Sequence, residues 1–462
     1  MTTVGLCMIV KDEAPIIERA LASVRRHISH WLIVDTGSTD GTQDIVQRAM
    51  ADVPGRLYER PFVDFGYNRT EAVQAARVCA DYTLLMDADE MLATADQFAW
   101  PQLETDIVEL GHVSANHHRR VPVVLSNRRS WQFHGVLYER LQVADTDTRS
   151  ILTDAVLREL RDGHRHTAVA PIERNTLDAR VLEAALKEDQ GNLHYRYRLA
   201  GCYRDSNRAT KALEAYRERV ALGGDRGEVA DSLLQIAHLL QRTGAEPDLV
   251  MAAYLNAWEA MPTRAEPLTD LAGFAREQSK YSLARLMAHR ALEILPPVDA
   301  PYIDETVYTW RSQDEYAVAS YWTGFVAESA VASSDLIARG VLPDTELVRV
   351  EQNLSFARSR CEEAGLAIPP VAYAATPPAR PVVTTAAPVN VESMENAGQV
   401  APEAVYVPLS APSVEASQNG VVAASGQAHL DAEGRIPVPM TALDDKAHQF
   451  RGLVPAMEPE NH

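Results

Sequence analysis

Short apolar runs alternate with stretches of helical periodicity over residues 4–141. The runs Val4–Val10, Trp31–Val34 and Tyr82–Met86 are almost uninterrupted, which is typical of strands that are covered on both faces. Strands that alternate with helices form a largely parallel sheet, so this region is predicted to be an α/β domain. The other predicted elements are a strand, Leu57–Pro61, and three helices, which begin at Pro15, before Ile45 and at Asn68.

The pattern changes from about Ile172, where Ala- and Leu-rich helical periodicity replaces the strand signals. One set of residues recurs at the same offsets, first as Leu199, Ala200, Tyr203, Ala212 and Tyr216 and then as Leu271, Ala272, Ala275, Ala284 and Ala288. A middle copy begins at Ile236, and both steps are close to the roughly 34-residue period of tetratricopeptide repeats. Small residues at such positions let paired helices approach closely, so a short α-solenoid is predicted here.

The last part of the chain, residues 365–462, has a different composition again. It is rich in Ala, Val, Pro, Ser and Thr and holds 13 of the 26 prolines, without sustained periodicity. Such a segment buries too little apolar surface to offset chain entropy, so it is predicted to be disordered. The chain is therefore expected to form an N-terminal domain over 1–170, a helical domain over 171–364 and this tail.

Charge and cysteine content narrow the class of protein. Lysine and arginine total 44 against 64 aspartates and glutamates, a formal charge of −20, so nucleic acid is not expected as a partner. The four cysteines lie far apart with no CxxC pair, which indicates neither a zinc site nor a disulfide framework. The N-terminus lacks a basic region, and no apolar run approaches the roughly 20 residues of a transmembrane segment. We expect a soluble, cytoplasmic protein, and its oligomeric state stays open.

Three carboxylates follow the strand Tyr82–Met86, in the sequence DADE. If the strand continues, Asp87 and Asp89 point to the same side, with Cβ atoms about 7 Å apart. One divalent cation fits in that gap, because Mg²⁺ or Mn²⁺ takes carboxylate, water and phosphate oxygens. DxD alone is common by chance, so the alternative is a solvated strand end. Glu90 lies off the face of the aspartates and is expected to be a supporting or solvated carboxylate.

Two more polar clusters stand at predicted strand ends. KDEA follows the strand Val4–Val10, and DTGSTD follows Trp31–Val34. Ligands of open α/β sheets bind outside the carboxyl ends of the strands. Since DADE is a third cluster of this kind, the sequence favours a nucleotide pocket at that edge.

Taken together, four stretches resemble family 2 glycosyltransferases of GT-A fold, in the order and at the spacings of that family. They are LCMIVKDEAPIIERALASV, LIVDTGSTDGTQDIV, DFGYNRTEAVQAA and YTLLMDADEML. The helical region is similar to tetratricopeptide-type segments, notably in LAGCYRDSNRATKALEAYRERVALGG. The resemblance implies a Rossmann-like GT-A domain followed by tetratricopeptide-like repeats, and it does not extend to the tail.

The resemblance also assigns donor-site roles to single residues. Asp35 would bind the base of a nucleotide-sugar, and Glu13 would help to fix the nucleoside. Asp87 would face the ribose and the metal, and Asp89 would coordinate the Mn²⁺ or Mg²⁺ that holds the diphosphate. The pair Asn68 and Arg69 would contact phosphates or nucleotide. The alternatives are acids that cap helices beside a turn, the preferred interpretation for Asp40, and a solvated arginine.

The catalytic base and the last metal ligand are less well defined. In WQFHGVLYERL, related sequences often read Gly-Val-x-His-Glu, and here Tyr138 stands at the histidine position. Glu139 is the candidate base, and its alternative is a glutamate on a strand surface. Tyrosine seldom binds Mg²⁺ or Mn²⁺, so His164 is the candidate metal ligand in its place, with His134 and His166 as further candidates.

Two functional hypotheses follow from the resemblance. The first is a metal-dependent enzyme that moves a sugar from a nucleoside diphosphate, with UDP favoured, to an acceptor hydroxyl with inversion. The helical repeats would then hold the acceptor, and a protein is one candidate. The second hypothesis is an inactive GT-A-like domain that serves as an interaction scaffold, which Tyr138 favours. The intact acidic residues and Arg69 favour the enzyme.

Overall fold

The protein is described here by a computed structural model over residues 2–115, 117–297 and 303–370. Within this part of the chain, a nine-stranded sheet has the order β3-β2-β1-β4-β7-β6-β10-β5, and β11 pairs with β7. The first four strands are β1 (Val4–Val10), β2 (His30–Asp35), β3 (Gly55–Glu59) and β4 (Tyr82–Leu85). These four strands pair in parallel, which confirms the predicted Rossmann-like arrangement.

The other half of the sheet is mixed. Its strands are β5 (Glu90–Thr94), β6 (Ile107–Ser114), β7 (His117–Ser126), β10 (Arg149–Glu159) and β11 (Ile303–Asp304). β7 runs antiparallel to β4 and β6, whereas β10 runs parallel to β6 and antiparallel to β5. A separate ribbon pairs β8 (Phe133–His134) with β9 (Arg140–Leu141). The segment between these two short strands carries the candidate base.

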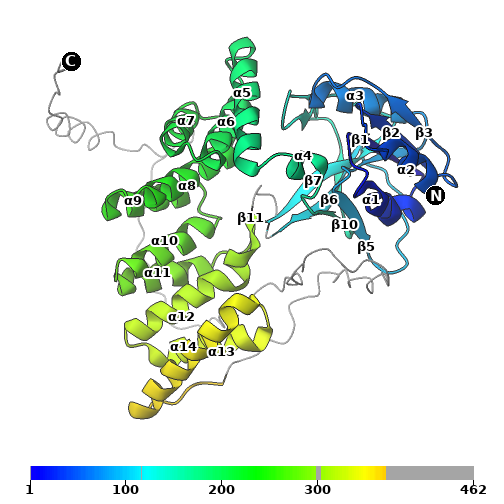
Figure 1. The fold of residues 1–462 in the computed structure, drawn as a ribbon. Coiled ribbons are helices and arrows are strands. Elements are labelled where there is room, and N and C mark those ends of the chain that lie inside the picture. Colours follow the sequence, from blue (N-terminus) through cyan, green and yellow to red (C-terminus); the bar gives the residue numbers. More distant parts are fainter. Residues whose placement is uncertain (1, 116, 298–302, 371–462) are drawn as a thin grey trace, which may run out of the picture. The chain divides into compact units, whose positions relative to one another are not determined.

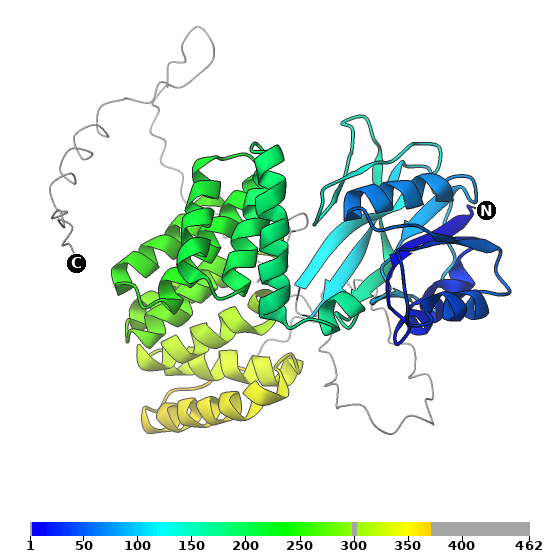
Figure 2. The same ribbon diagram turned by 45° about the horizontal axis from the view of Figure 1, so that its top comes forward.

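Helices cover both faces of the parallel half. They are α1 (Ile17–Val24), α2 (Thr42–Ala49) and α3 (Phe65–Ala76), and the short 3₁₀ helix η1 (Arg25–His27) follows α1. Leu6 of β1 and Leu84 of β4 pack with the apolar residues of α1, while Cys7 and Leu85 pack with those of α3. Successive strand residues face opposite sides, so both faces of the sheet are apolar. Figure 2 shows α3 on one side of the sheet and α1 and α2 on the other.

The second region is helical, as predicted. After the short α4 (His164–Thr167) come α5 (Pro171–Glu188), α6 (Leu193–Asp205), α7 (Ala209–Ala221), α8 (Arg226–Arg242), α9 (Pro247–Ala260), α10 (Glu266–Glu277), α11 (Tyr281–Leu292), the π-helix η2 (Val307–Arg311), α12 (Ser312–Trp322), α13 (Val326–Arg339) and α14 (Asp344–Glu363). Consecutive helices from α5 to α14 stack beside one another (Figure 1). The repeated small residues, such as Ala200, Ala212, Ala272 and Ala284, are fully buried. The predicted α-solenoid is therefore confirmed.

Two sequence predictions are not tested by the described residues. The tail predicted to be disordered lies outside them from residue 371 onward. The domain boundaries stay predictions, although β10 ends at Glu159 and α5 begins at Pro171, on either side of residue 170. Among the described residues, no helix combines the length and the apolar character that crossing a membrane requires.

Replacing Leu84 by alanine tests the central role of β4. The Leu84 side chain is fully buried between strands and α1, so Leu84→Ala is expected to lower the free energy of unfolding by about 2–5 kcal/mol. The measurement is urea denaturation followed by circular dichroism. Val78→Ala is the matched control, since Val78 is 89% exposed and its change should stay within about 0.5 kcal/mol. Equal midpoints for both variants would contradict this assignment of the core.

Candidate functional site

The loops after β1 and β2 are joined by hydrogen bonds at the carboxyl edge of the sheet. Asp12 donates its backbone N–H to Ser38 Oγ (2.8 Å) and accepts the N–H of Thr39 (2.7 Å). Asp40, predicted to cap a helix, accepts the N–H of Ala14 at 2.9 Å. The residue at the N-cap position of α2 is Gly41, but Asp40 Oδ1 accepts the N–H of Thr42, the first residue of α2, at 3.0 Å. Asp40 therefore satisfies a donor at the start of that helix, as predicted, and also connects the two loops.

Asp35 is buried with half of its carboxylate unsatisfied. Its Oδ1 accepts hydrogen bonds from the backbone of Gly37 (2.9 Å) and Ser38 (2.8 Å) and from the Gln43 amide (3.2 Å). Its Oδ2 is equally buried and has no hydrogen-bond partner among the described residues. A buried acceptor without a partner is costly, so a ligand that brings an N–H group, such as the ring of a nucleobase, would be stabilised there.

The DADE sequence is a turn and not the end of a strand, which corrects the expected geometry. β4 ends at Leu85 and β5 begins at Glu90, and the Glu90 N–H bonds the Asp87 carbonyl at 3.1 Å. The Glu90 carboxylate is buried, where it accepts the Asp87 N–H (2.8 Å) and lies 2.9 Å from His112 Nε2. Glu90 is therefore a supporting residue that holds the turn, as one of the two expectations had it.

An acidic cluster forms where this turn meets the end of β10. Ligand atoms of Asp89, Glu159 and His166 all lie within 4.8 Å of one another, and His166 Nε2 is 3.9 Å from Asp89 Oδ2. Burial, followed by the charges of Asp87 and Glu90, raises the pKa of Asp89 to about 7. Arg161 Nε lies 3.5 Å from Glu159 Oε1, whereas no arginine or lysine among the described residues pairs with Asp89, and a divalent cation would supply its counter-charge.

His164, predicted as a metal ligand, contacts Glu13 through its backbone. Its backbone N–H donates to Glu13 Oε2 at 3.0 Å, and no ligand atom of His164 belongs to the cluster around Asp89. A Cβ atom on Gly163 would lie 3.4 Å from both Glu13 and Asp89, so the chain passes close to both carboxylates at this glycine. Burial raises the pKa of Glu13. The structure thus brings His166, and not His164, to the predicted metal residue.

Arg69 connects two of the predicted residues. Its Nε donates to Glu139 Oε1 at 2.6 Å and its Nη2 to Asp87 Oδ1 at 3.1 Å. Burial alone would lower the pKa of Arg69, but the charges of Asp87 and Glu139 outweigh it and raise the pKa. The candidate base and the acidic turn are therefore held by one buried guanidinium, and Asp87 faces Arg69 instead of the cluster around Asp89.

The Asn68 side chain bonds the backbone of the loop before α3. Its side chain is buried, Oδ1 accepts the Val63 N–H at 2.8 Å, and Nδ2 donates to the Pro61 carbonyl at 3.0 Å. The amide therefore orders the loop that leads into α3. Any effect of Asn68 on a ligand would pass through the position of its neighbour Arg69.

Tyr138 lies away from the acidic cluster, among the helices. Its hydroxyl donates to Asp178 Oδ2 of α5 at 3.2 Å, and the Arg198 guanidinium of α6 lies 4.6 Å from its ring centroid. His134, another candidate ligand, is exposed on β8, where its ring is 2.8 Å from Gln142. Neither side chain belongs to the cluster of Asp89, Glu159 and His166.

Sequence reasoning missed two members of this site, Glu159 and His112. Each belongs to a strand of the mixed half of the sheet, β10 and β6, for which no strands were predicted. Glu159 is the last residue of β10, so the rule that strand ends carry ligands would have selected it if that strand had been identified. No local signal distinguishes His112.

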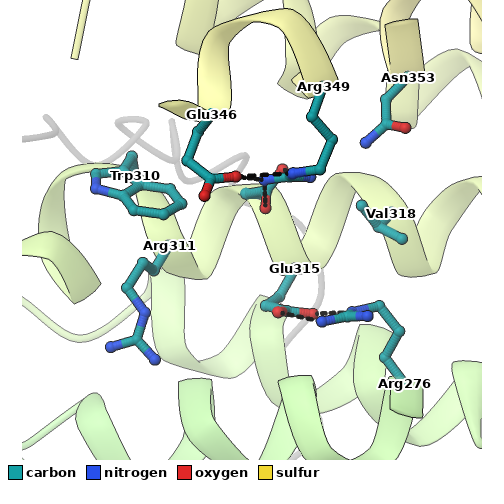
Figure 3. Close-up of a pocket in the computed structure, with 9 residues that line it drawn as sticks. Arg276, Trp310, Arg311, Glu315, Val318, Glu346, Arg349 and Asn353 are labelled. Carbon is teal, nitrogen blue, oxygen red and sulfur yellow. Dashed lines mark hydrogen bonds and ion pairs between the residues drawn. The ribbon is translucent and has the colours of Figure 1, made fainter. Parts of the chain in front are cut away.

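A cavity of about 410 Å³ lies in the helical region between α10, α12 and α14 (Figure 3). Its walls are ion pairs between these helices: Arg276 with Glu315 at 2.7 Å, and Arg349 with Asp314 at 2.8 Å. Arg311, which also lines it, bonds Asp270 of α10 at 2.6 Å. These guanidiniums hold neighbouring helices together, so the candidate functional site is the acidic edge of the sheet.

Comparisons with known proteins agree with this location. Residues 6–134 match the model of glycosyl transferase family 2. A TPR repeat-containing protein of Synechococcus elongatus is 38% identical over 107 residues, which are 23% of this chain and 25% of that relative. The chain therefore matches a quarter of the length of this curated relative.

Solved structures similar to the chain include helical-repeat proteins. A tetratricopeptide repeat protein from Parabacteroides merdae covers 42% of this chain and 70% of its own, with 17% identity and a TM-score of 0.33. BtubC from P. vanneervenii covers 42% and 83%, with 18% identity and a TM-score of 0.34. Scores of this size establish no detailed likeness. The family match and the observed elements together show that this chain carries a family 2 glycosyltransferase domain fused to tetratricopeptide-like helical repeats.

Proposed function

We propose that the acidic edge of the sheet transfers a sugar from a nucleoside diphosphate, with UDP favoured, to an acceptor hydroxyl. The observation that carries the proposal is the cluster of Asp89, Glu159 and His166, which brings two carboxylates and an imidazole within 4.8 Å of one another at the edge where α/β sheets bind ligands. The unpaired Oδ2 of Asp35 at the same edge supports a nucleobase as part of the donor.

Asp89, Glu159 and His166 are the residues that would hold the metal. Two carboxylates and one imidazole suit Mn²⁺ better than Mg²⁺, which takes oxygen ligands. The ion would neutralise the charge that develops on the departing diphosphate. This set keeps Asp89 from the sequence prediction, leaves out Asp87, adds Glu159 and replaces His164 by His166.

The side chains of the domain would perform the remaining tasks. Asp35 accepts an N–H of the base, and Glu13, half-buried beside Gly163, bounds the nucleoside side of the site. Arg69 holds the Glu139 carboxylate in place by a hydrogen bond of 2.6 Å. In the reaction the acceptor oxygen bonds the anomeric carbon, the bond from that carbon to the phosphate oxygen breaks, and the diphosphate leaves with the electron pair. Glu139 takes the acceptor proton. Direct displacement inverts the anomeric centre.

The helical repeats are the proposed site for the acceptor, and a protein is the proposed acceptor class. Stacked helix pairs create extended surfaces that bind polypeptides. The alternative of an inactive scaffold rested on Tyr138 in place of a histidine ligand. It loses that support because Tyr138 points into the helices while His166 stands beside Asp89.

Removing Asp89 tests the donor site. UDP with Mn²⁺ is expected to raise the melting temperature, by a stabilisation of about 2.7 kcal/mol when UDP is a hundred times its Kd. Asp89→Ala should abolish the Mn²⁺-dependent part of this shift, because it deletes the central carboxylate of the cluster. Asp96→Ala, at an exposed aspartate on the loop after β5, is the control and should retain the shift. The proposal fails if UDP gives no Mn²⁺-dependent shift with the unaltered protein, or if Asp89→Ala retains one.

Glu139→Gln tests the base separately from donor binding. The amide can still bond Arg69 but cannot take a proton, so kcat is expected to fall by about 10²–10⁴-fold. The shift with UDP and Mn²⁺ should persist. Activity is measured as UDP release from a UDP-sugar, and Glu104→Gln, at an exposed residue, is the control. An unchanged kcat would assign the proton to another group.

A further inference from the structure

The segment that carries Glu139 is held on one side by the first turn of α3. Gly66 donates its N–H to the Gly135 carbonyl at 2.9 Å, and Phe65 donates to the Val136 carbonyl at 3.4 Å. A Cβ atom on Gly66 would lie only 2.8 Å from the Gly135 oxygen, so this close approach requires glycine. The helix that supplies Arg69 therefore also fixes the start of the segment.

The first helical repeat holds the same segment on the other side. Val136 donates its N–H to the Tyr195 hydroxyl of α6 at 2.9 Å. Leu137 is 6% exposed and shares one apolar cluster with Ala179 and Leu182 of α5. Over these residues the segment packs against helices that follow it in sequence by some 40 residues or more, and it is not a free loop of the sheet domain.

Tyr138 is the residue at which the segment turns. Its φ of 55° lies in the left-handed region, which is unfavourable for a residue other than glycine. Such a conformation persists only where the surroundings impose it. Here they do: the Tyr138 hydroxyl bonds Asp178 and its ring lies under Arg198. With Tyr138 fixed in the helices, the next residue, Glu139, is directed back to Arg69.

A buried polar network supports this arrangement from behind. Glu228 of α8 accepts Arg219 at 2.8 Å, lies 2.7 Å from His194 Nδ1 and also pairs with Arg140. The other ring nitrogen of His194 is 3.2 Å from the Tyr138 carbonyl oxygen. Contacts therefore run without interruption from α7 and α8 through α6 to the residue that precedes Glu139.

We infer that the first helical repeat is part of the active site, and that Tyr138, with Tyr195 behind Val136, is a positioning residue that seats Glu139 for proton removal. This inference rests on the proposed function of Glu139. Donor binding depends on Asp35 and on the cluster around Asp89, which lie on other segments. Loss of Tyr138 should therefore lower kcat while leaving donor affinity unchanged.

The test uses full-length protein with UDP-sugar, Mn²⁺ and water in place of the acceptor. In this reaction a water oxygen bonds the anomeric carbon, UDP leaves with the electron pair and Glu139 takes the water proton. Tyr138→Ala frees the segment, and misplacement of a reacting group by about 1 Å costs on the order of 100-fold in rate. We expect kcat for UDP release to fall about 100-fold with unchanged KM and an unchanged UDP shift.

Conservative variants separate positioning from folding. Tyr138→Phe keeps the ring under Arg198 and loses the hydroxyl contacts with Asp178 and Cys202. Tyr195→Phe loses the hydrogen bond to Val136, and each variant should lose no more than about tenfold in kcat. Tyr203→Phe is the matched control. Tyr203 also lies on α6 and also bonds a carboxylate of α5, Glu183 at 2.7 Å, but its hydroxyl does not bond the segment. Its kcat should be unchanged.

A double variant gives the decisive readout. If Tyr138 acts through Glu139, then Tyr138→Ala combined with Glu139→Gln is no slower than Glu139→Gln alone, because the losses are not additive within one unit. Additive losses, or an unchanged kcat in Tyr138→Ala, would overturn the inference. If the unaltered protein releases no UDP, the proposed function itself fails, and that result is distinct from either of these.

Discussion

The buried ion pair between Arg69 and Glu139 is the interaction on which the rest of the site depends. Both side chains are only 12% exposed, and a charge at this depth is tolerated only with a partner. Arg69 reaches Asp87 as well, so one guanidinium links α3, the turn after β4 and the segment after β8. Three parts of the chain that are distant in sequence are thus held together by electrostatics.

The carboxylates at the carboxyl edge of the sheet favour the binding of a cation. Arg69 compensates Asp87 and Glu139, and Arg161 lies 3.5 Å from Glu159, but the neighbour of Asp89 is His166. Burial lowers the pKa of His166, so that imidazole is a better ligand than counter-charge. Burial and the charges of Asp87 and Glu90 raise the pKa of Asp89. A divalent ion would favour its ionised form, and an anionic diphosphate would then be attracted to the same place.

The helical repeats also contact the segment that carries Glu139. Their first helices do so through Tyr138 and Tyr195. Tyrosine in place of the family histidine gives a side chain that can fill an apolar interface and still bond Asp178. The substitution that favoured an inactive scaffold therefore supplies an anchor, while a histidine from α4 stands beside Asp89.

Much of the fold was predictable because the signals are local. Uninterrupted apolar runs identified β1, β2 and β4, and helical spacing identified α1 to α3, since burial on both faces of a sheet acts on each strand alone. The repeat period identified the solenoid, because each repeat packs only against its neighbours. The strands of the mixed half escaped prediction. Their pairing joins residues far apart in the chain, as with β6 and β10.

The sequence by itself determined the chemical character of the site: acids at strand ends, an arginine on the third helix, and a glutamate after an altered motif. Only the tertiary structure decided how they meet. It showed that DADE is a turn held by Glu90, that His166 rather than His164 faces Asp89, and that Asn68 is bonded to backbone. The physical reason is that ligand sets and buried ion pairs depend on distances across the fold, whereas a sequence records only neighbours along the chain.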